Sequence, residues 1–175
     1  MHKSAGRPAD LAESQGLGAS TPTVQSLLHE VSIRAESGSL DDALLLVRKS
    51  YEYAANSADT AWILHREGQV LLDLGYRSEA EHAYIKMRAL GEEIQDARIL
   101  GWSNFGLGAV HQTGGESENA RSAYRLSLTS LQKAKDFHAI INVMLNWAKL
   151  AIEAQQLDEA SETLGAAETL LPPNP

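Results

Sequence analysis

Four alanines recur at a nearly constant interval, and this interval restricts the fold more than any other feature of the chain. Ala43, Ala80, Ala120 and Ala160 are separated by 37, 40 and 40 residues. Periods of roughly 20 to 50 residues are typical of solenoids built from one repeated supersecondary unit. Small residues allow two helices to approach closely, and a large residue beside them fills the remaining space. Two further positions repeat with the alanines. Twelve residues before them stand Val31, Gly68, Gly108 and Ala148, and four residues after them stand Val47, Tyr84, Tyr124 and Leu164.

Each unit is predicted to be a pair of antiparallel helices joined by a short turn. Apolar residues recur at helical spacing between residues 27 and 35, Gly38 ends that helix, and Ser39 can cap the next. Alanine and leucine carry much of the apolar content, which favours helices over strands. The predicted fold class is all-α, an α-solenoid of about four helix hairpins. The remaining turns are predicted at Gly75-Tyr76-Arg77-Ser78, Gly114-Gly115 and Gln155-Gln156-Leu157-Asp158, with a capping box between Ser78 and Glu81.

A single helical repeat domain is expected over residues 23–172. Its repeats are expected at about 24–57, 58–97, 98–137 and 138–172. Residues 1–22 are rich in Ser, Gly, Ala and Pro without a sustained period, which predicts a disordered tail. The alternative for that segment is a short helix around residues 8–15.

Charge and composition exclude several classes of partner. The formal net charge is −8, whereas a nucleic-acid-binding domain needs a basic face. The absence of cysteine excludes disulfides, thiolate nucleophiles and cysteine-based zinc sites. No apolar segment has the length of a signal peptide or of a membrane span. We therefore expect a cytoplasmic protein that binds neither nucleic acid nor membrane.

The glycines between residues 101 and 115 do not form a nucleotide-binding motif. Gly101 and Gly106 have the spacing of a P-loop, but Leu107 stands where the phosphate-binding lysine is required. The six histidines include no H-E-x-x-H pair, and no nucleophile-elbow motif occurs. Adjacent acids such as Glu92 and Glu93 do not face each other on a helix. The sequence therefore predicts no enzyme activity, no cofactor and no metal site.

The repeated positions resemble the signature of the tetratricopeptide repeat family. The second unit carries Gly68, Gly75, Ala80 and Tyr84, and the resemblance extends over residues 23–172. A period near 40 is longer than the common length of about 34, and it is similar to the long-repeat subclass found in kinesin light chains and bacterial peptide-sensing regulators. The other units carry Gly108, Gly115, Ala120 and Tyr124; Ala148, Ala160, Ala167 and Pro172; and, in a degenerate first unit, Gly38 and Ala43.

The resemblance implies a concave groove lined by the first helix of each unit. Asn146 stands where the long-repeat subclass often carries a ligand-binding asparagine, and Trp147 is expected in the core. For Trp62 and Trp102 a place in the groove and a place in the core both stay open. The implied groove residues are Trp62, His65, Arg66, Gln69, Trp102, Phe105, Gln112, Asn142, Asn146 and Lys149.

The function implied by the resemblance is non-catalytic binding of a protein or peptide in this groove. One alternative is a self-associating, homodimeric adaptor, because the first helix over residues 23–37 has a wide apolar face. The other alternative is a sensor of a small ligand or peptide.

Overall fold

A computed structural model describes residues 22–170. The predicted tail, except for residue 22, and Pro172 lie outside this range. Within it the chain has no strand, which confirms the all-α class. The elements are α1 (Val24–Glu36), α2 (Leu40–Ser50), the 3-10 turn η1 (Tyr51–Tyr53), α3 (Ser57–Asp73), α4 (Arg77–Glu93), α5 (Ala97–Thr113), α6 (Ser117–Ala134), α7 (Phe137–Glu153) and α8 (Leu157–Glu168).

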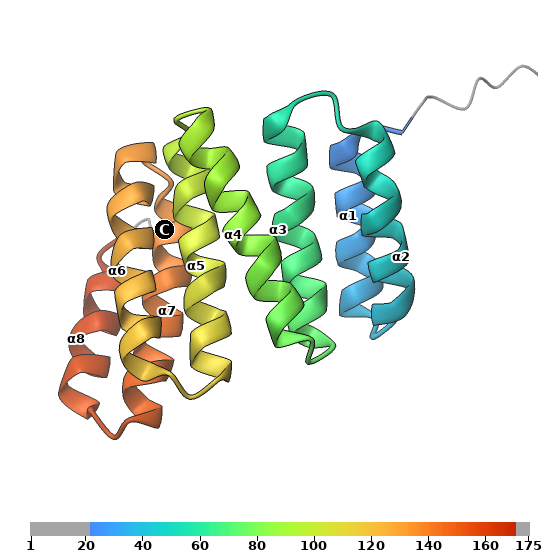
Figure 1. Ribbon diagram of the computed structural model, residues 1–175. Coiled ribbons are helices and arrows are strands. Elements are labelled where there is room, and N and C mark those ends of the chain that lie inside the picture. The colour runs from blue at the N-terminus through green and yellow to red at the C-terminus, as the bar shows by residue number, and fades with distance from the viewer. Residues whose placement is uncertain (1–21, 171–175) are drawn as a thin grey trace, which may run out of the picture.

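The helices pair into consecutive antiparallel hairpins, which stack side by side (Figure 1). Helix α1 packs on α3, α3 on α5, and α5 on α7. We call these odd-numbered helices the inner layer and their even-numbered partners the outer layer. The stack has the packing of a tetratricopeptide-like helical repeat solenoid. In the part of the chain that the structure describes, no helix is both long enough and apolar enough to cross a membrane.

The hairpin turns depend on residues with positive φ. Gly38, Gly75 and Gly115 have φ of 82°, 81° and 72°, values that cost little only for a residue without a Cβ. In the last hairpin Gln155 adopts the same left-handed conformation, with φ of 59°. The predicted turns are therefore confirmed, and the last one is formed without glycine.

The helix starts differ from the sequence prediction. Helix α4 begins at Arg77 after Tyr76, so Ser78 lies inside the first turn and the predicted capping box is wrong. Ser39 precedes α2, but its side chain makes no capping hydrogen bond. By contrast, every inner-layer helix begins at a side chain that accepts from the first-turn backbone N–H groups. These capping residues are Thr23, Asn56, Asp96 and Asp136.

Glycines bring the layers close together, as the spacing predicts. A Cβ at Gly68 would lie 2.7 Å from Cζ of Tyr84, and the ring of Tyr124 covers Gly108 in the same way. Both tyrosine side chains are at most 2% exposed. The small-to-large contact between the two helices of a hairpin is therefore the repeated unit of the core.

Ion pairs connect successive hairpins. Arg77 Nη2 lies 2.5 Å from Glu116 Oε1, and Gly114 leaves the space that the guanidinium occupies. Asn119, His111 and Arg77 all donate to Glu116 and hold the pKa of its carboxyl at about 2. Since Arg77 begins α4 and Glu116 precedes α6, this pair fixes the second hairpin against the third.

Candidate functional site

Four rings from α3 and α5 form a continuous row along the inner layer. The ring centroid of Trp102 lies 6.5 Å from that of Trp62, 5.1 Å from that of His65 and 5.7 Å from that of Phe105. These contacts are edge-to-face, the arrangement that aromatic pairs prefer. We call Trp62, His65, Trp102 and Phe105 the aromatic row. The structure thus brings together four of the residues that the resemblance implied.

Each tryptophan of the row is part core and part surface. Trp62 and Trp102 are half-buried, and both pack on the apolar cluster between α3, α4 and α5. The guanidinium carbon of Arg98 lies 5.3 Å from the Trp62 ring centroid, within cation–π range. The choice between groove and core is therefore not exclusive, because each ring packs on one side and remains accessible on another.

Asp136 holds the edge of the row. Its Oδ2 accepts from Trp102 Nε1 at 3.3 Å and from Arg98 Nε at 2.8 Å, while its Oδ1 caps α7 by accepting from Ala139 N–H. Burial raises the pKa of the Asp136 carboxyl, but these hydrogen bonds and the charge of Arg98 outweigh it and hold the pKa below its ordinary value. One ionised carboxylate thus positions Trp102, Arg98 and the start of α7.

His65 is enclosed by the other rings and is only 7% exposed. Burial lowers the pKa of its imidazole to about 3, and the charge of Arg66 contributes in the same direction. Its Nδ1 is buried and has no hydrogen-bond partner among the described residues. His65 is therefore neutral at physiological pH, and it lies buried behind the other rings rather than exposed in the implied groove.

Arg66 lies half-buried between two hollows in the inner layer. Its Nη1 donates to Gln69 Oε1 at 2.7 Å, while its Nε is buried and has no partner within residues 22–170. We call the hollow that Tyr84 lines the Tyr84 pocket and the other the Trp62 pocket. The Tyr84 pocket has a volume of about 360 Å³ and lies between α1, α3 and α5; the other, of about 370 Å³, is lined by Trp62, Arg66 and Arg98.

Gln112 is already engaged within the protein. Its Oε1 accepts from the Tyr124 hydroxyl at 2.7 Å, and its Nε2 donates to Glu153 Oε2 at 2.9 Å. Lys149 is exposed and lies 3.9 Å from the other oxygen of Glu153. Glu153 therefore links Gln112 and Lys149, two residues of the predicted groove.

The two asparagines of α7 are also half-buried on the inner layer. Asn146 Nδ2 donates to the Asn142 carbonyl one turn earlier, at 2.9 Å. The neighbouring Trp147 lies at the margin of the core rather than inside it, with its Nε1 donating to Glu159 Oε1 at 2.8 Å. The amide of Asn146 still offers an oxygen acceptor and a second N–H donor.

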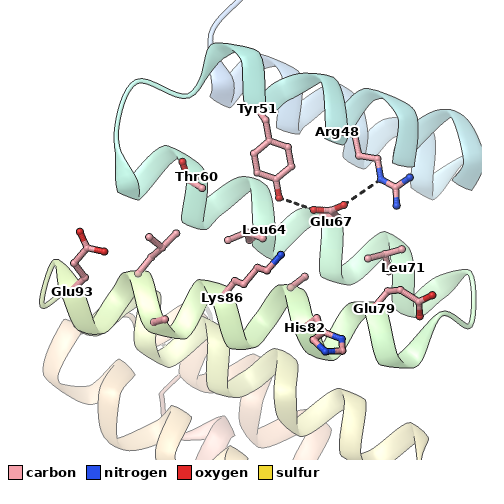
Figure 2. A pocket seen from close by; sticks show the side chains of 13 residues that line it. Arg48, Tyr51, Thr60, Leu64, Glu67, Leu71, Glu79, His82, Lys86 and Glu93 are labelled. Carbon is pink, nitrogen blue, oxygen red and sulfur yellow. Dashed lines mark hydrogen bonds and ion pairs between the residues drawn. The ribbon is translucent and has the colours of Figure 1, made fainter.

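A cleft on the outer layer was missed by sequence reasoning. It has a volume of about 820 Å³ and separates α2 from α4 above an apolar floor that includes Leu64 and Leu71 (Figure 2). On one wall the Tyr51 hydroxyl donates to Glu67 Oε2 at 2.6 Å, and Arg48 Nε lies 3.3 Å from the other carboxylate oxygen. Burial first, and then the hydrogen bond to Glu67, raise the pKa of Tyr51.

The length of α2 explains the outer cleft. Helix α2 has 11 residues, whereas α4 has 17 and α6 has 18. The missing turns leave one side of α3 and α4 uncovered. The interval of 37 residues between Ala43 and Ala80, shorter than the later 40, is the signal in the sequence that could have indicated it.

The fold is that of a tetratricopeptide-like helical repeat solenoid. No protein-family model and no curated protein matches the sequence. Among solved structures, the chain is similar to BtubC (BKLC) from P. vanneervenii, a kinesin light chain-like protein, with a TM-score of 0.66 and 14% identity. The match covers 87% of this chain and 66% of that chain. At this identity the likeness shows the fold alone.

Proposed function

We propose that this protein is a non-catalytic scaffold that binds an extended segment of a partner protein, or a peptide, along its inner layer. The aromatic row is the observation that carries the proposal, because half-exposed tryptophans beside pockets are frequent anchors of binding surfaces. The likeness to a kinesin light chain-like structure supports a scaffold of the long-repeat kind. We place its site of action in the cytoplasm.

The residues have different roles in this proposal. Trp62, Trp102 and Phe105 contact apolar side chains of the bound segment. Arg66 and Asn146 hydrogen-bond to its backbone or polar groups, since an amide offers a donor and an acceptor at once. His65 packs behind the row and fixes the tryptophans. The remaining contacts come from Gln69, Gln112, Asn142 and Lys149.

Selection from a random-peptide display library on immobilised protein tests the proposal. We expect enriched peptides to bind wild-type protein and to lose at least tenfold in affinity on Trp62→Ala. Leu126→Ala is the matched control, because Leu126 is 54% exposed on α6 of the outer layer. The proposal fails if no peptide is enriched, or if the enriched peptides bind both variants equally.

Self-association is the second candidate function. Ile33 on α1 is 47% exposed and Leu45 on α2 is 71% exposed, so the first hairpin presents apolar side chains to solvent. A second copy of the chain is the proposed cover. Light scattering over a concentration series tests this candidate, and a monomer at every concentration contradicts it.

A further inference from the structure

The Tyr84 pocket contains opposite charges that do not pair with one another. Arg66 lines it, as do Glu36 at the end of α1 and Asp73 at the end of α3. Burial lowers the pKa of Arg66, and the fields of Tyr84 and Glu36 offset this only in part. No carboxylate within residues 22–170 lies within ion-pair distance of this guanidinium. Six other arginines of that range do have such a partner: Arg34, Arg48, Arg77, Arg88, Arg98 and Arg121.

The partial burial of the Arg66 charge indicates that a ligand with an opposite charge is missing from the pocket. Burial is the main cause that lowers the pKa of Arg66, which means that its charge is held away from water without full compensation. Burial also raises the pKa of Asp73, although that side chain is exposed at the end of α3. A half-buried charge is normally paired with an opposite charge, whereas half-buried Arg66 has only its hydrogen bond to Gln69. A ligand that carries charges of both signs would satisfy both walls of the pocket.

In the next repeat, the tyrosine equivalent to Tyr84 has a hydrogen-bond partner. The Tyr124 hydroxyl donates to Gln112 Oε1, but the residue at the equivalent position beside Tyr84 is Leu72, which offers no acceptor. Gly106 stands where the preceding repeat has Arg66, so this position adds no side chain to the pocket and the Tyr84 ring packs directly against it. His65 adds a buried Nδ1 without a partner to the same pocket. The second repeat thus lacks the hydrogen-bond acceptor that the third repeat offers to its equivalent tyrosine.

The positions of the charges define the ligand. Asp73 follows Arg66 by seven residues, so the two lie about two helical turns, or ~10 Å, apart along α3. The Tyr84 hydroxyl lies in the fields of both, since Asp73 raises its pKa and Arg66 lowers it, after the larger effect of burial. The pocket holds one positive and two negative groups. One carboxylate and two cationic groups, joined by a short apolar stem, complement it.

We propose that the Tyr84 pocket binds a free basic amino acid such as lysine, arginine or ornithine. Its α-carboxylate pairs with Arg66, and its α-ammonium and side-chain cation pair with Glu36 and Asp73. The methylene stem lies against the apolar part of the lining, which includes Val70 and Phe105. A volume of about 360 Å³ is at the small end of the range for ligand pockets and suits a molecule of this size. This site does not depend on the inner layer binding a peptide.

Calorimetric titration of the full chain with L-lysine and L-arginine tests the proposal. Cadaverine, which lacks the carboxylate, and Nα-acetyl-lysine, which lacks the α-ammonium, are the matched probes. We expect at least one basic amino acid to bind, with at least tenfold higher affinity than either matched probe, and to raise Tm by about 3–6 °C at 10-fold excess over Kd. No binding of either amino acid, or equal affinity for cadaverine, overturns the proposal.

Three variants assign the binding to this pocket. Arg66→Met and Asp73→Asn are each expected to weaken binding at least tenfold, whereas Asp41→Asn, an exposed acid on α2, leaves it unchanged. Asp73 is exposed at the end of its helix, so its variant retains the fold even if Arg66→Met does not. Full affinity in Asp73→Asn contradicts the proposed site. Peptide selection on the same samples is a separate readout, so either proposal can fail alone.

Discussion

The ring of Tyr84 fills the space in which a side chain of Gly106 would otherwise lie. The two residues come from different hairpins, α4 and α5, so this contact joins successive repeats. Gly106→Ala is expected to lower the free energy of unfolding by about 1–3 kcal/mol, because the buried ring cannot move without repacking its neighbours. Urea denaturation measures the change.

Gly165→Ala is the matched control for that substitution. Gly165 also lies within a helix, α8, but a Cβ there meets nothing within 4 Å. It is expected to raise stability by up to about 1 kcal/mol, because alanine favours the helix over glycine. Equal effects of the two substitutions would mean that Tyr84 does not occupy the space beside Gly106.

A substitution in the last hairpin turn is expected to increase the stability of the protein. Gln155 adopts a left-handed conformation that glycine supplies in the other three hairpins. Gln155→Gly is expected to stabilise the protein by about 0.5–1 kcal/mol, and Gly115→Ala to destabilise it by a similar amount or more. Thermal unfolding of both variants checks the pair. Destabilisation by Gln155→Gly would contradict the role assigned to the turn.

Acidification is expected to destabilise the fold through His65. The pKa of this histidine is about 3 in the folded chain and about 6.5 when unfolded. Between these values the unfolded state binds the additional proton, so this contribution to stability is complete above pH 6.5 and is lost as pH falls toward 3. At pH 5 the loss is about 2 kcal/mol relative to pH 7.

A comparison of two variants isolates this contribution. His65→Phe copies the residue that the next repeat carries at Phe105, and it removes the titrating group. Its free energy of unfolding is expected to fall less between pH 7 and pH 5 than that of wild type, by about 2 kcal/mol. His29→Gln, an exposed histidine on α1, is expected to retain the wild-type dependence. Identical pH dependence in all three proteins would refute the burial argument.

Asp136 is expected to stabilise through two separable interactions. Asp136→Asn keeps an oxygen that caps α7 but loses the ion pair with Arg98, whereas Asp136→Ala loses both. We expect Asp136→Ala to cost about 1 kcal/mol more than Asp136→Asn, the typical contribution of a helix cap. Chemical denaturation gives both values, and tryptophan fluorescence reports the release of Trp102. Equal costs would show that the cap contributes nothing.

The hairpins and their turns could be predicted because their causes are local. A glycine such as Gly75 ends a helix through its own φ, and the pairing of Gly68 with Tyr84 recurs at a fixed offset. The capping box at Ser78 failed because the tight turn starts α4 two residues earlier than a Ser78 cap requires. Sequence periodicity gives the repeat, but it does not give the first residue of each helix.

The partners across repeats could not be predicted from the sequence. Trp102 and Asp136 are 34 residues apart, and Gln112 and Glu153 are 41 apart, so nothing in their local patterns pairs them. The charge imbalance of the Tyr84 pocket is likewise visible only when α1, α3 and α5 are brought together. The family resemblance indicated which face of the inner layer would bind a partner. The structure adds which side chains of that face already form hydrogen bonds or ion pairs within the protein.

Calorimetry of one selected peptide against a double variant tests the central claim most directly. Arg66→Ala with Asn146→Ala removes polar groups from the second and fourth hairpins, and both side chains are half-buried on the inner layer. Lys86→Ala with Leu126→Ala is the matched change on the outer layer. The proposed binding mode predicts at least a tenfold loss of affinity for the inner-layer pair and none for the outer-layer pair. Unchanged affinity in the inner-layer double variant would contradict it.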